Sequence, residues 1–199
     1  MDWLQYENEL KEKGYRYICG VDEAGRGPLA GEVYAAAVIL KADEIIEGVN
    51  DSKKLSEKKR DVLFKTIQER ALAYSVAFAS VEEIEEMNIL QATLLAMKRA
   101  VETLNITPDY AIIDGNKIPN LTVPCQAIVK GDAKSMSIAS ASILAKVSRD
   151  RKMKEYALQY PQYGFEKHKG YGTKIHIEAL KQYGACAIHR QSFLKNILK

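Results

Sequence analysis

Residues 17–31, YICGVDEAGRGPLAG, decide the fold and contain the first candidate site residues. The apolar run at 18–21 predicts a buried strand, and two adjacent carboxylates, Asp22 and Glu23, end it. Carboxylates at the end of a buried strand cost free energy unless positive charge compensates them. Hard cations such as Mg²⁺ and Mn²⁺ prefer oxygen ligands, and the following Gly-Arg-Gly can bring backbone N–H groups and a guanidinium close to phosphate. The stretch therefore indicates a divalent metal site beside a phosphate-contacting loop.

Two other interpretations of this stretch stand beside the metal site. An acidic pair followed by glycine is also an ordinary polar turn after a strand. A dinucleotide-binding fingerprint competes because Gly25, Gly27 and Gly31 follow a strand. That fingerprint must open a helix, whereas residues 33–40, VYAAAVIL, predict a second strand. The pattern therefore disfavours a dinucleotide site.

Length and composition indicate one ordinary globular domain spanning residues 1–199. Within it, residues 1–16 form an N-terminal extension, and residues 160–199 form a C-terminal loop and helices. No run of eighteen apolar residues predicts a membrane span, and the acidic N-terminus lacks the apolar region of a signal peptide. Three cysteines without metal-ligand spacing predict reduced thiols in a cytoplasmic protein.

The distribution of charge says more than the net charge of +3, which comes from 29 basic and 26 acidic residues. Basic side chains cluster at residues 53–60, 146–154 and 167–169. Such runs are usually solvated helix faces, and we expect residues 146–160 to be basic and exposed. Several clusters around a carboxylate site also indicate a phosphate-backbone partner.

Strand and helix patterns alternate along the chain, which predicts an α/β fold with a mixed five-stranded sheet flanked by helices, plus a small helical C-terminal region. Ser56 and Ser80 are predicted N-caps, and Asn88 is predicted to begin a further helix. The predicted strands are 18–21, 33–40, 71–79, 110–113 and 122–129, and the predicted helices are 57–70, 88–104, 135–158 and 175–183.

Two further acids follow predicted strands. Asp114 ends a strand, and Asp132 stands between the last strand and the long helix. Taken singly, they are also a common turn residue and a helix-cap residue. Ligands gather at the carboxyl ends of parallel strands, so we expect both to join Asp22 and Glu23. Four carboxylates suit two divalent ions and phosphodiester hydrolysis.

The four-carboxylate site requires a particular orientation of Glu23. Adjacent strand residues point to opposite faces, so Asp22 and Glu23 cannot both face one site from a regular strand. We expect a turn at Gly25 to redirect Glu23.

A series of motifs, in order along the chain, resembles bacterial ribonuclease HII from about residue 17 to residue 193. Glu32 departs from the pattern, because the family commonly has proline there, and it predicts a less rigid turn or an added exposed charge. The matching motifs are DEAGRGPLAG at 22–31, DSKKLS at 51–56, DG at 114–115, KGD at 130–132, IASASILAKVSRDR at 138–151, HKGYGT at 168–173 and HRQSF at 189–193.

The resemblance implies an RNase H-like fold and an endoribonuclease that cleaves RNA in RNA/DNA hybrids and nicks 5′ of single ribonucleotides in duplex DNA. It implies a two-metal mechanism with Mg²⁺ or Mn²⁺ that leaves a 3′-hydroxyl and a 5′-phosphate, in a monomer without membrane association. His168 and His189 are expected to be structural hydrogen-bonding residues. The implied catalytic and metal-binding residues are Asp22, Glu23, Asp114 and Asp132, and the implied substrate contacts are Gly25, Arg26, Gly27, Ser52, Lys53 and Tyr171.

Two related functions remain as alternatives. The resemblance implies that Gly25-Arg26-Gly27 recognises the RNA–DNA junction through the 2′-hydroxyl and adjoining phosphates. Ribonuclease HIII shares the carboxylates but lacks this Gly-Arg-Gly loop and generally needs a run of ribonucleotides, so Arg26 and Tyr171 argue against it. A non-hydrolytic hybrid-binding module would have little reason to keep four clustered carboxylates, because like charges without metal are destabilising.

Overall fold

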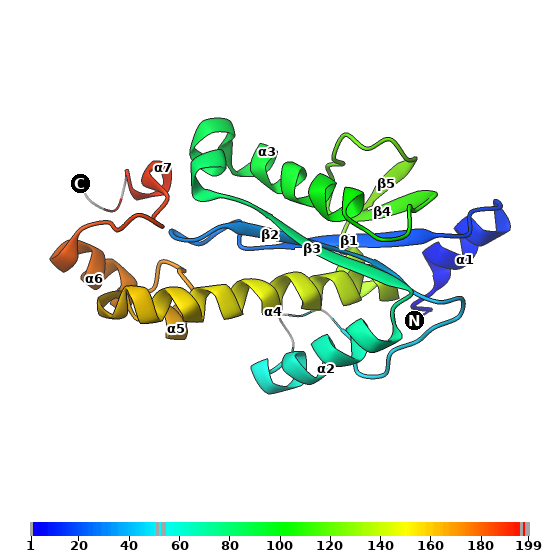
Figure 1. The fold of residues 1–199 in the computed structure, drawn as a ribbon, viewed down its shortest axis with the longest axis horizontal. Coiled ribbons are helices and arrows are strands. Elements are labelled where there is room, and N and C mark those ends of the chain that lie inside the picture. The colour runs from blue at the N-terminus through cyan, green and yellow to red at the C-terminus, as the bar shows by residue number, and fades with distance from the viewer. Residues whose placement is uncertain (1, 51, 53–54, 196, 198–199) are drawn as a thin grey trace.

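A mixed five-stranded sheet forms the centre of the molecule (Figure 1), in a computed structural model that describes residues 2–50, 52, 55–195 and 197. The strand order is β3-β2-β1-β4-β5. β1 pairs antiparallel with β2 and parallel with β4, which confirms the predicted mixed sheet. The strands are β1 (Ile18–Ala24), β2 (Val33–Ile39), β3 (Ala73–Ala79), β4 (Tyr110–Asp114) and β5 (Cys125–Ile128).

Helices cover both faces of this sheet. α3 (Val81–Glu102) packs on one face, and α4 (Met136–Gln159) with α2 (Glu57–Arg70) packs on the other (Figure 1). α4 approaches β1 closely, since a Cβ on Gly20 would lie 2.3 Å from the backbone nitrogen of Ile138. The small residues that begin α4 and the glycine of β1 therefore set the spacing between helix and sheet.

The predicted helix starts are confirmed by their caps. Ser56 accepts a hydrogen bond from the Lys59 N–H, and Ser80 forms a capping box with Glu83. Asn88 lies at a kink inside α3 with φ 74°, and its Oδ1 accepts from the backbone N–H groups of Leu90 and Gln91. This local cap restarts the helix at the predicted residue, although the two helical stretches form one continuous element.

The C-terminal region forms a small apolar core of its own beside the end of α4. Phe165, Tyr163 and Leu180 are buried there against Met153. In the described part of the chain, no helix is long and apolar enough to span a bilayer. The remaining elements are α1 (Gln5–Glu12), η2 (Gly131–Ala133), η3 (Pro161–Tyr163), α5 (Phe165–His168), α6 (Lys174–Tyr183) and α7 (Gln191–Leu194).

α1, within the region predicted as an extension, packs on the N-terminus of α4. The Glu7 carboxylate is buried, and its Oε1 accepts from the hydroxyls of Ser135 (2.6 Å) and Ser137 (2.6 Å) and from the Ser137 N–H (3.2 Å). The Met136 N–H donates to the Trp3 carbonyl at 2.9 Å. A negative charge at a helix N-terminus is favourable, so α1 supplies part of the cap of α4.

We expect Glu7→Ala to lower the free energy of unfolding by about 1–3 kcal/mol, because it leaves several buried donors at the start of α4 without their acceptor. Urea denaturation measures this change. Glu12→Ala, at the exposed C-terminal end of the same helix, is the control and should cost far less. Equal losses in the two variants would contradict the capping role of Glu7.

Candidate metal centre

Three carboxylates meet at the carboxyl ends of β1 and β4. Asp22, Glu23 and Asp114 each offer an oxygen within 4.8 Å of the others. Val21 of β1 pairs with Ile113 of β4, which places Asp22 and Asp114 next to each other where these parallel strands end. The sequence-based expectation that strand ends gather these acids is met for all three.

Glu23 reaches the group without the expected turn. β1 stays paired with β2 through Ala24, so Asp22 lies opposite Ala36 and Glu23 opposite Ala35. Ala36 packs in the core under α4 and Ala35 in the core under α3, so the two acids start from opposite faces of the sheet. β4 ends at Asp114, and we infer that the Glu23 side chain passes around this strand end.

Burial makes the metal-free cluster unfavourable. Burial raises the pKa of Asp22 well above its usual value, and the nearby charges of Glu23 and Asp114 raise it further. Hydrogen bonds from Ser142 and from the Glu23 N–H, which lies 2.7 Å from Oδ1 of Asp22, oppose this shift only in part. Oxygen-only ligands with excess negative charge fit a hard divalent cation such as Mg²⁺ or Mn²⁺.

Asp132 adjoins the cluster through its backbone. Its N–H and that of Gly131 donate to Oδ1 of Asp114 at 3.3 and 2.6 Å. Among the described residues, the acids whose oxygens lie within 4.8 Å of one another are Asp22, Glu23 and Asp114. Asp132 lies beside this group and is not a member of it. The short η2 turn therefore fixes the orientation of Asp114 and keeps Asp132, which is itself buried, beside it.

The loop at residues 25–32 is held by Arg149 of α4, a residue that we expected to be exposed. Arg149 is 1% exposed, which corrects that expectation. Its Nε donates to the Glu32 carbonyl (3.1 Å) and its Nη2 to the Ala30 carbonyl (3.0 Å). Its Nη1 donates to the Lys169 carbonyl at 3.0 Å, which ties the loop to the segment before Tyr171.

Arg190, fully buried, holds the other half of this loop. Its Nε donates to the carbonyl of Gly31 (2.8 Å) and its Nη2 to that of Gly25 (2.7 Å). Its Nη1 donates to the carbonyls of Arg26 (3.0 Å) and Pro28 (2.9 Å). The sequence placed Arg149 in a basic cluster expected to face solvent and gave Arg190 no role of its own, because nothing local marks an arginine as buried.

Gly25 and Arg26 occupy contrasting environments in this loop. Gly25 has φ +100°, and a Cβ there would lie 2.1 Å from Nε of Arg149, so only glycine fits. The Arg26 side chain is half exposed, and its Nη1 lies 3.4 Å from Oε1 of Glu23. The loop therefore presents a guanidinium beside the carboxylates.

Glu32 does not add an exposed charge. It is buried, and one carboxylate oxygen accepts a hydrogen bond from the Tyr156 hydroxyl of α4. This contact corrects the expectation of a solvated acid at the position where the motif usually has proline.

A pocket of about 220 Å³ lies between this loop, Ser52, Ser142 and Tyr171. Ser52 is buried, and its hydroxyl lies 2.9 Å from that of Ser142. A hydroxyl has one proton, so if Ser142 donates to Asp22, then Ser52 donates to Ser142. Tyr171 is 43% exposed, and Lys53 lies outside the described residues.

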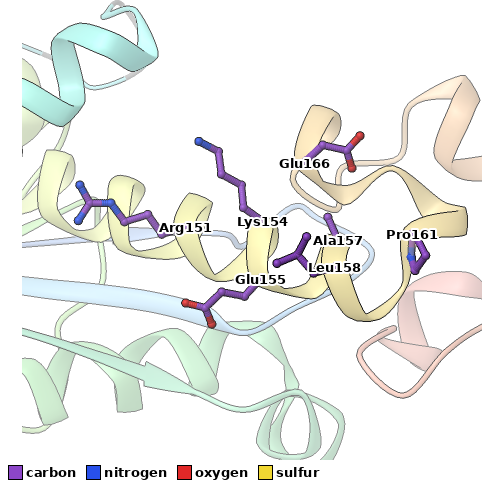
Figure 2. Close-up of a pocket in the computed structure, with 7 residues that line it drawn as sticks. All are labelled: Arg151, Lys154, Glu155, Ala157, Leu158, Pro161 and Glu166. Atoms are coloured by element: carbon purple, nitrogen blue, oxygen red, sulfur yellow. The ribbon is translucent and has the colours of Figure 1, made fainter.

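A larger pocket of about 530 Å³ lies away from the carboxylates, along the second half of α4. Figure 2 shows Leu158 and Lys154 of α4 at this pocket, with Glu166 of α5 opposite. Leu158 is exposed, and Lys154 pairs with Glu57 at 2.6 Å. None of the sequence-predicted site residues lines this pocket.

Comparisons with known proteins agree on one family. The family model described as Ribonuclease HII matches residues 19–196. A curated ribonuclease HII from Caldicellulosiruptor bescii is 61% identical over 197 residues, which cover 99% of this chain and 96% of that protein. The crystal structure of ribonuclease H2 from Pyrococcus horikoshii is similar at 28% identity with a TM-score of 0.76, over 92% of this chain and 97% of that one.

The RNase H-like fold is confirmed by these structural matches. The structure of Bst-RNase HIII in complex with Mn²⁺ shares the fold, with a TM-score of 0.64 at 20% identity, over 84% of this chain and 63% of that one.

We expect Asp22→Asn to raise the melting temperature of the metal-free protein, by about 2–4 °C for each kcal/mol of relieved repulsion. The folded-state pKa of Asp22 lies above its unfolded value, so stability falls as pH rises from about 4 through the folded-state pKa. The variant should lose this part of the pH dependence. Mn²⁺ should stabilise the parent protein and should stabilise the variant less.

Differential scanning calorimetry with and without Mn²⁺ measures both effects. Asp61→Asn, which alters a surface carboxylate paired with Arg151, is the matched control and should leave the response to Mn²⁺ unchanged. If Asp22→Asn responded to Mn²⁺ as the parent protein does, the three carboxylates would not be the metal centre.

Proposed function

Because the chain belongs to the ribonuclease HII family and is a divalent-metal-dependent ribonuclease H, we propose that it cleaves the RNA strand of RNA/DNA hybrids and nicks 5′ of single ribonucleotides in duplex DNA. The products would carry a 3′-hydroxyl and a 5′-phosphate. The observation that carries this proposal is the carboxylate cluster with Arg26 beside it. Arg26 and the loop amides offer the donors that a ribonucleotide and its phosphates need.

We propose that two Mg²⁺ or Mn²⁺ ions are held by Asp22, Glu23, Asp114 and Asp132 when substrate is bound. Bound ions supply an activated water and stabilise the leaving oxygen. The protein holds Asp114 in place through the N–H groups of Gly131 and Asp132, and holds Asp22 through Ser142. Because these contacts come from the protein itself, they orient the carboxylates for binding the ions.

The loop at residues 25–32 supports recognition of the 2′-hydroxyl. Arg149 and Arg190 bind the carbonyls of this loop and fix its shape. The proposed donors to the substrate are the backbone N–H groups of the Gly25-Arg26-Gly27 turn. The 2′-hydroxyl distinguishes RNA from DNA at one position, so a reader of single ribonucleotides must contact it.

Tyr171 lines the 220 Å³ pocket next to Gly27, where a Cβ would lie 3.8 Å from its ring. We propose that its ring stacks on the deoxyribose that follows the ribonucleotide. Ser52 lines the same pocket, and Lys53 is proposed to contact a backbone phosphate. A binding surface of this kind makes affinity fall with salt. We further propose that the enzyme acts as a monomer.

The test is cleavage of three duplexes, which contain one ribonucleotide, four consecutive ribonucleotides, or DNA alone. Each is incubated with Mg²⁺, Mn²⁺ or a chelator. We expect metal-dependent nicking 5′ of the single ribonucleotide and no cleavage of DNA. Cleavage only of the four-ribonucleotide duplex would overturn the proposal in favour of a ribonuclease HIII-like specificity.

Asp132→Asn should reduce cleavage by about a thousandfold or more while preserving or raising affinity for the duplex, because it removes charge that repels phosphate. Rapid-quench cleavage and fluorescence anisotropy measure the two quantities. Asp61→Asn again serves as the surface control. Near-normal turnover of Asp132→Asn would remove this residue from the catalytic set.

Arg26→Ala should reduce cleavage at a single ribonucleotide about tenfold or more, and cleavage of a long hybrid less, because a hybrid offers other 2′-hydroxyls. Tyr171→Ala should act in the same direction. The ratio of the two rates is the measured quantity. If a variant slowed cleavage of both substrates equally, the substituted residue would have no part in recognising the RNA–DNA junction.

A further inference from the structure

The three histidines of the chain lie together behind Tyr171. His176 and His189 are fully buried, and the His168 and His176 rings stack with centroids 4.5 Å apart. Phe165 packs edge-on against His176 at 5.4 Å. None of the three lines the pocket at Tyr171, so they are not placed to touch a substrate.

Hydrogen bonds fix the tautomers of two of these rings. The Cys186 N–H donates to Nδ1 of His189 at 2.9 Å, so that nitrogen carries no proton. Nε2 of His189 then carries the proton and donates to Nε2 of His176 at 3.0 Å. Nδ1 of His176 must therefore be protonated, and it donates to the Tyr171 carbonyl at 2.9 Å.

Only neutral rings can form this chain of hydrogen bonds. A second proton on His176 would go to Nε2 and bring two N–H groups to face each other across the 3.0 Å contact. A second proton on His189 would go to Nδ1 and face the Cys186 N–H at 2.9 Å. Burial lowers the pKa of His189 to about 4, and His176 adds to that effect. Burial also lowers the pKa of His176, so both rings are neutral at physiological pH.

The segment that contains His189 also holds the loop at residues 25–32, which lines the same pocket as Tyr171. Ile188 accepts a hydrogen bond from the Gly31 N–H at 2.8 Å, and Arg190 binds the carbonyls of the loop at residues 25–32. A further bond, from the Leu29 N–H to the Gly170 carbonyl at 2.8 Å, joins that loop to the segment before Tyr171. Residues 188–190 therefore contact both this loop and, through His189 and His176, the Tyr171 carbonyl.

We propose that His189 and His176 form a positioning relay, in which His189 orients His176 and His176 holds the Tyr171 carbonyl, so that the Tyr171 ring faces the substrate pocket. The relay rests on the proposed function, because its effect on cleavage acts through Tyr171. It makes both histidines positioning residues rather than catalytic residues. The Thr173 N–H also donates to the Tyr171 carbonyl, at 2.8 Å, so loss of the relay weakens the position of this peptide rather than freeing it.

The relay is tested first without any substrate. In ¹⁵N spectra of the histidine rings, we expect His176 protonated at Nδ1 and His189 at Nε2 at neutral pH. The opposite tautomers, or two charged rings, would overturn the relay. This measurement stands even if the chain were to cut no ribonucleotide substrate, so failure of the proposed function and failure of the relay are distinguishable.

The second test uses variants and the ratio of single-ribonucleotide to long-hybrid cleavage. His189→Leu removes the donor to His176 and should lower this ratio about two- to tenfold, the effect of one neutral hydrogen bond. His189→Gln can place its amide near Nε2 and should restore much of the ratio. Tyr163→Phe removes the 2.9 Å bond to the Gly184 carbonyl in the same apolar core and is the control, with no change in ratio expected.

A double-mutant cycle with Tyr171→Ala separates positioning from general destabilisation. If His189 acts through Tyr171, His189→Leu should not change the ratio further in the Tyr171→Ala background. An equal further loss there, or an equal loss in Tyr163→Phe, would overturn the relay. All rates are compared at a temperature where calorimetry shows each variant to be folded.

Discussion

The site depends on two buried guanidiniums that bind the carbonyls of one loop. Arg149 and Arg190 together donate to six carbonyls between Gly25 and Glu32, so this loop has a fixed shape without belonging to any helix or strand. A buried charge is costly unless its donors are paired, and here the donors meet carbonyl oxygens. Burial, followed by the charge of Arg149, lowers the pKa of Arg190 to about 9, which leaves it charged at neutral pH.

One face of α4 contacts β1 and the loop that follows it at regular intervals. Ser135, Ser142 and Arg149 are spaced by seven residues, about two helical turns, and so share one face of the helix. Ser135 caps the helix, Ser142 bonds Asp22, and Arg149 contacts the position where Gly25 would carry a Cβ. From 137 to 149 the helix rises about 18 Å, and from 20 to 25 the strand rises about 17 Å, so the contacts stay in register.

Strand pairing and backbone hydrogen bonds also hold the carboxylates together despite their mutual repulsion. Asp22 and Asp114 are brought together by parallel pairing, which the apolar core on both faces of the sheet stabilises. Backbone N–H groups of Gly131 and Asp132 orient Asp114, and the cap from α1 supports the start of the helix that follows them. A bound cation would relieve the repulsion that remains among the acids, and this relief favours cation binding.

The sequence by itself determined the five strands, the capped helix starts, the new helical start at Asn88 and the meeting of Asp22 with Asp114, because periodicity, caps and strand ends are local patterns. Tertiary structure alone decided that Arg149 is buried, that Ser52 faces Ser142, and that Glu23 joins the cluster from a regular strand. It also decided which ring nitrogens of His189 and His176 carry a proton. The partners of Arg149 and Arg190 lie more than a hundred residues away along the chain, apart from Lys169, and no local pattern reports which distant carbonyls a side chain will meet.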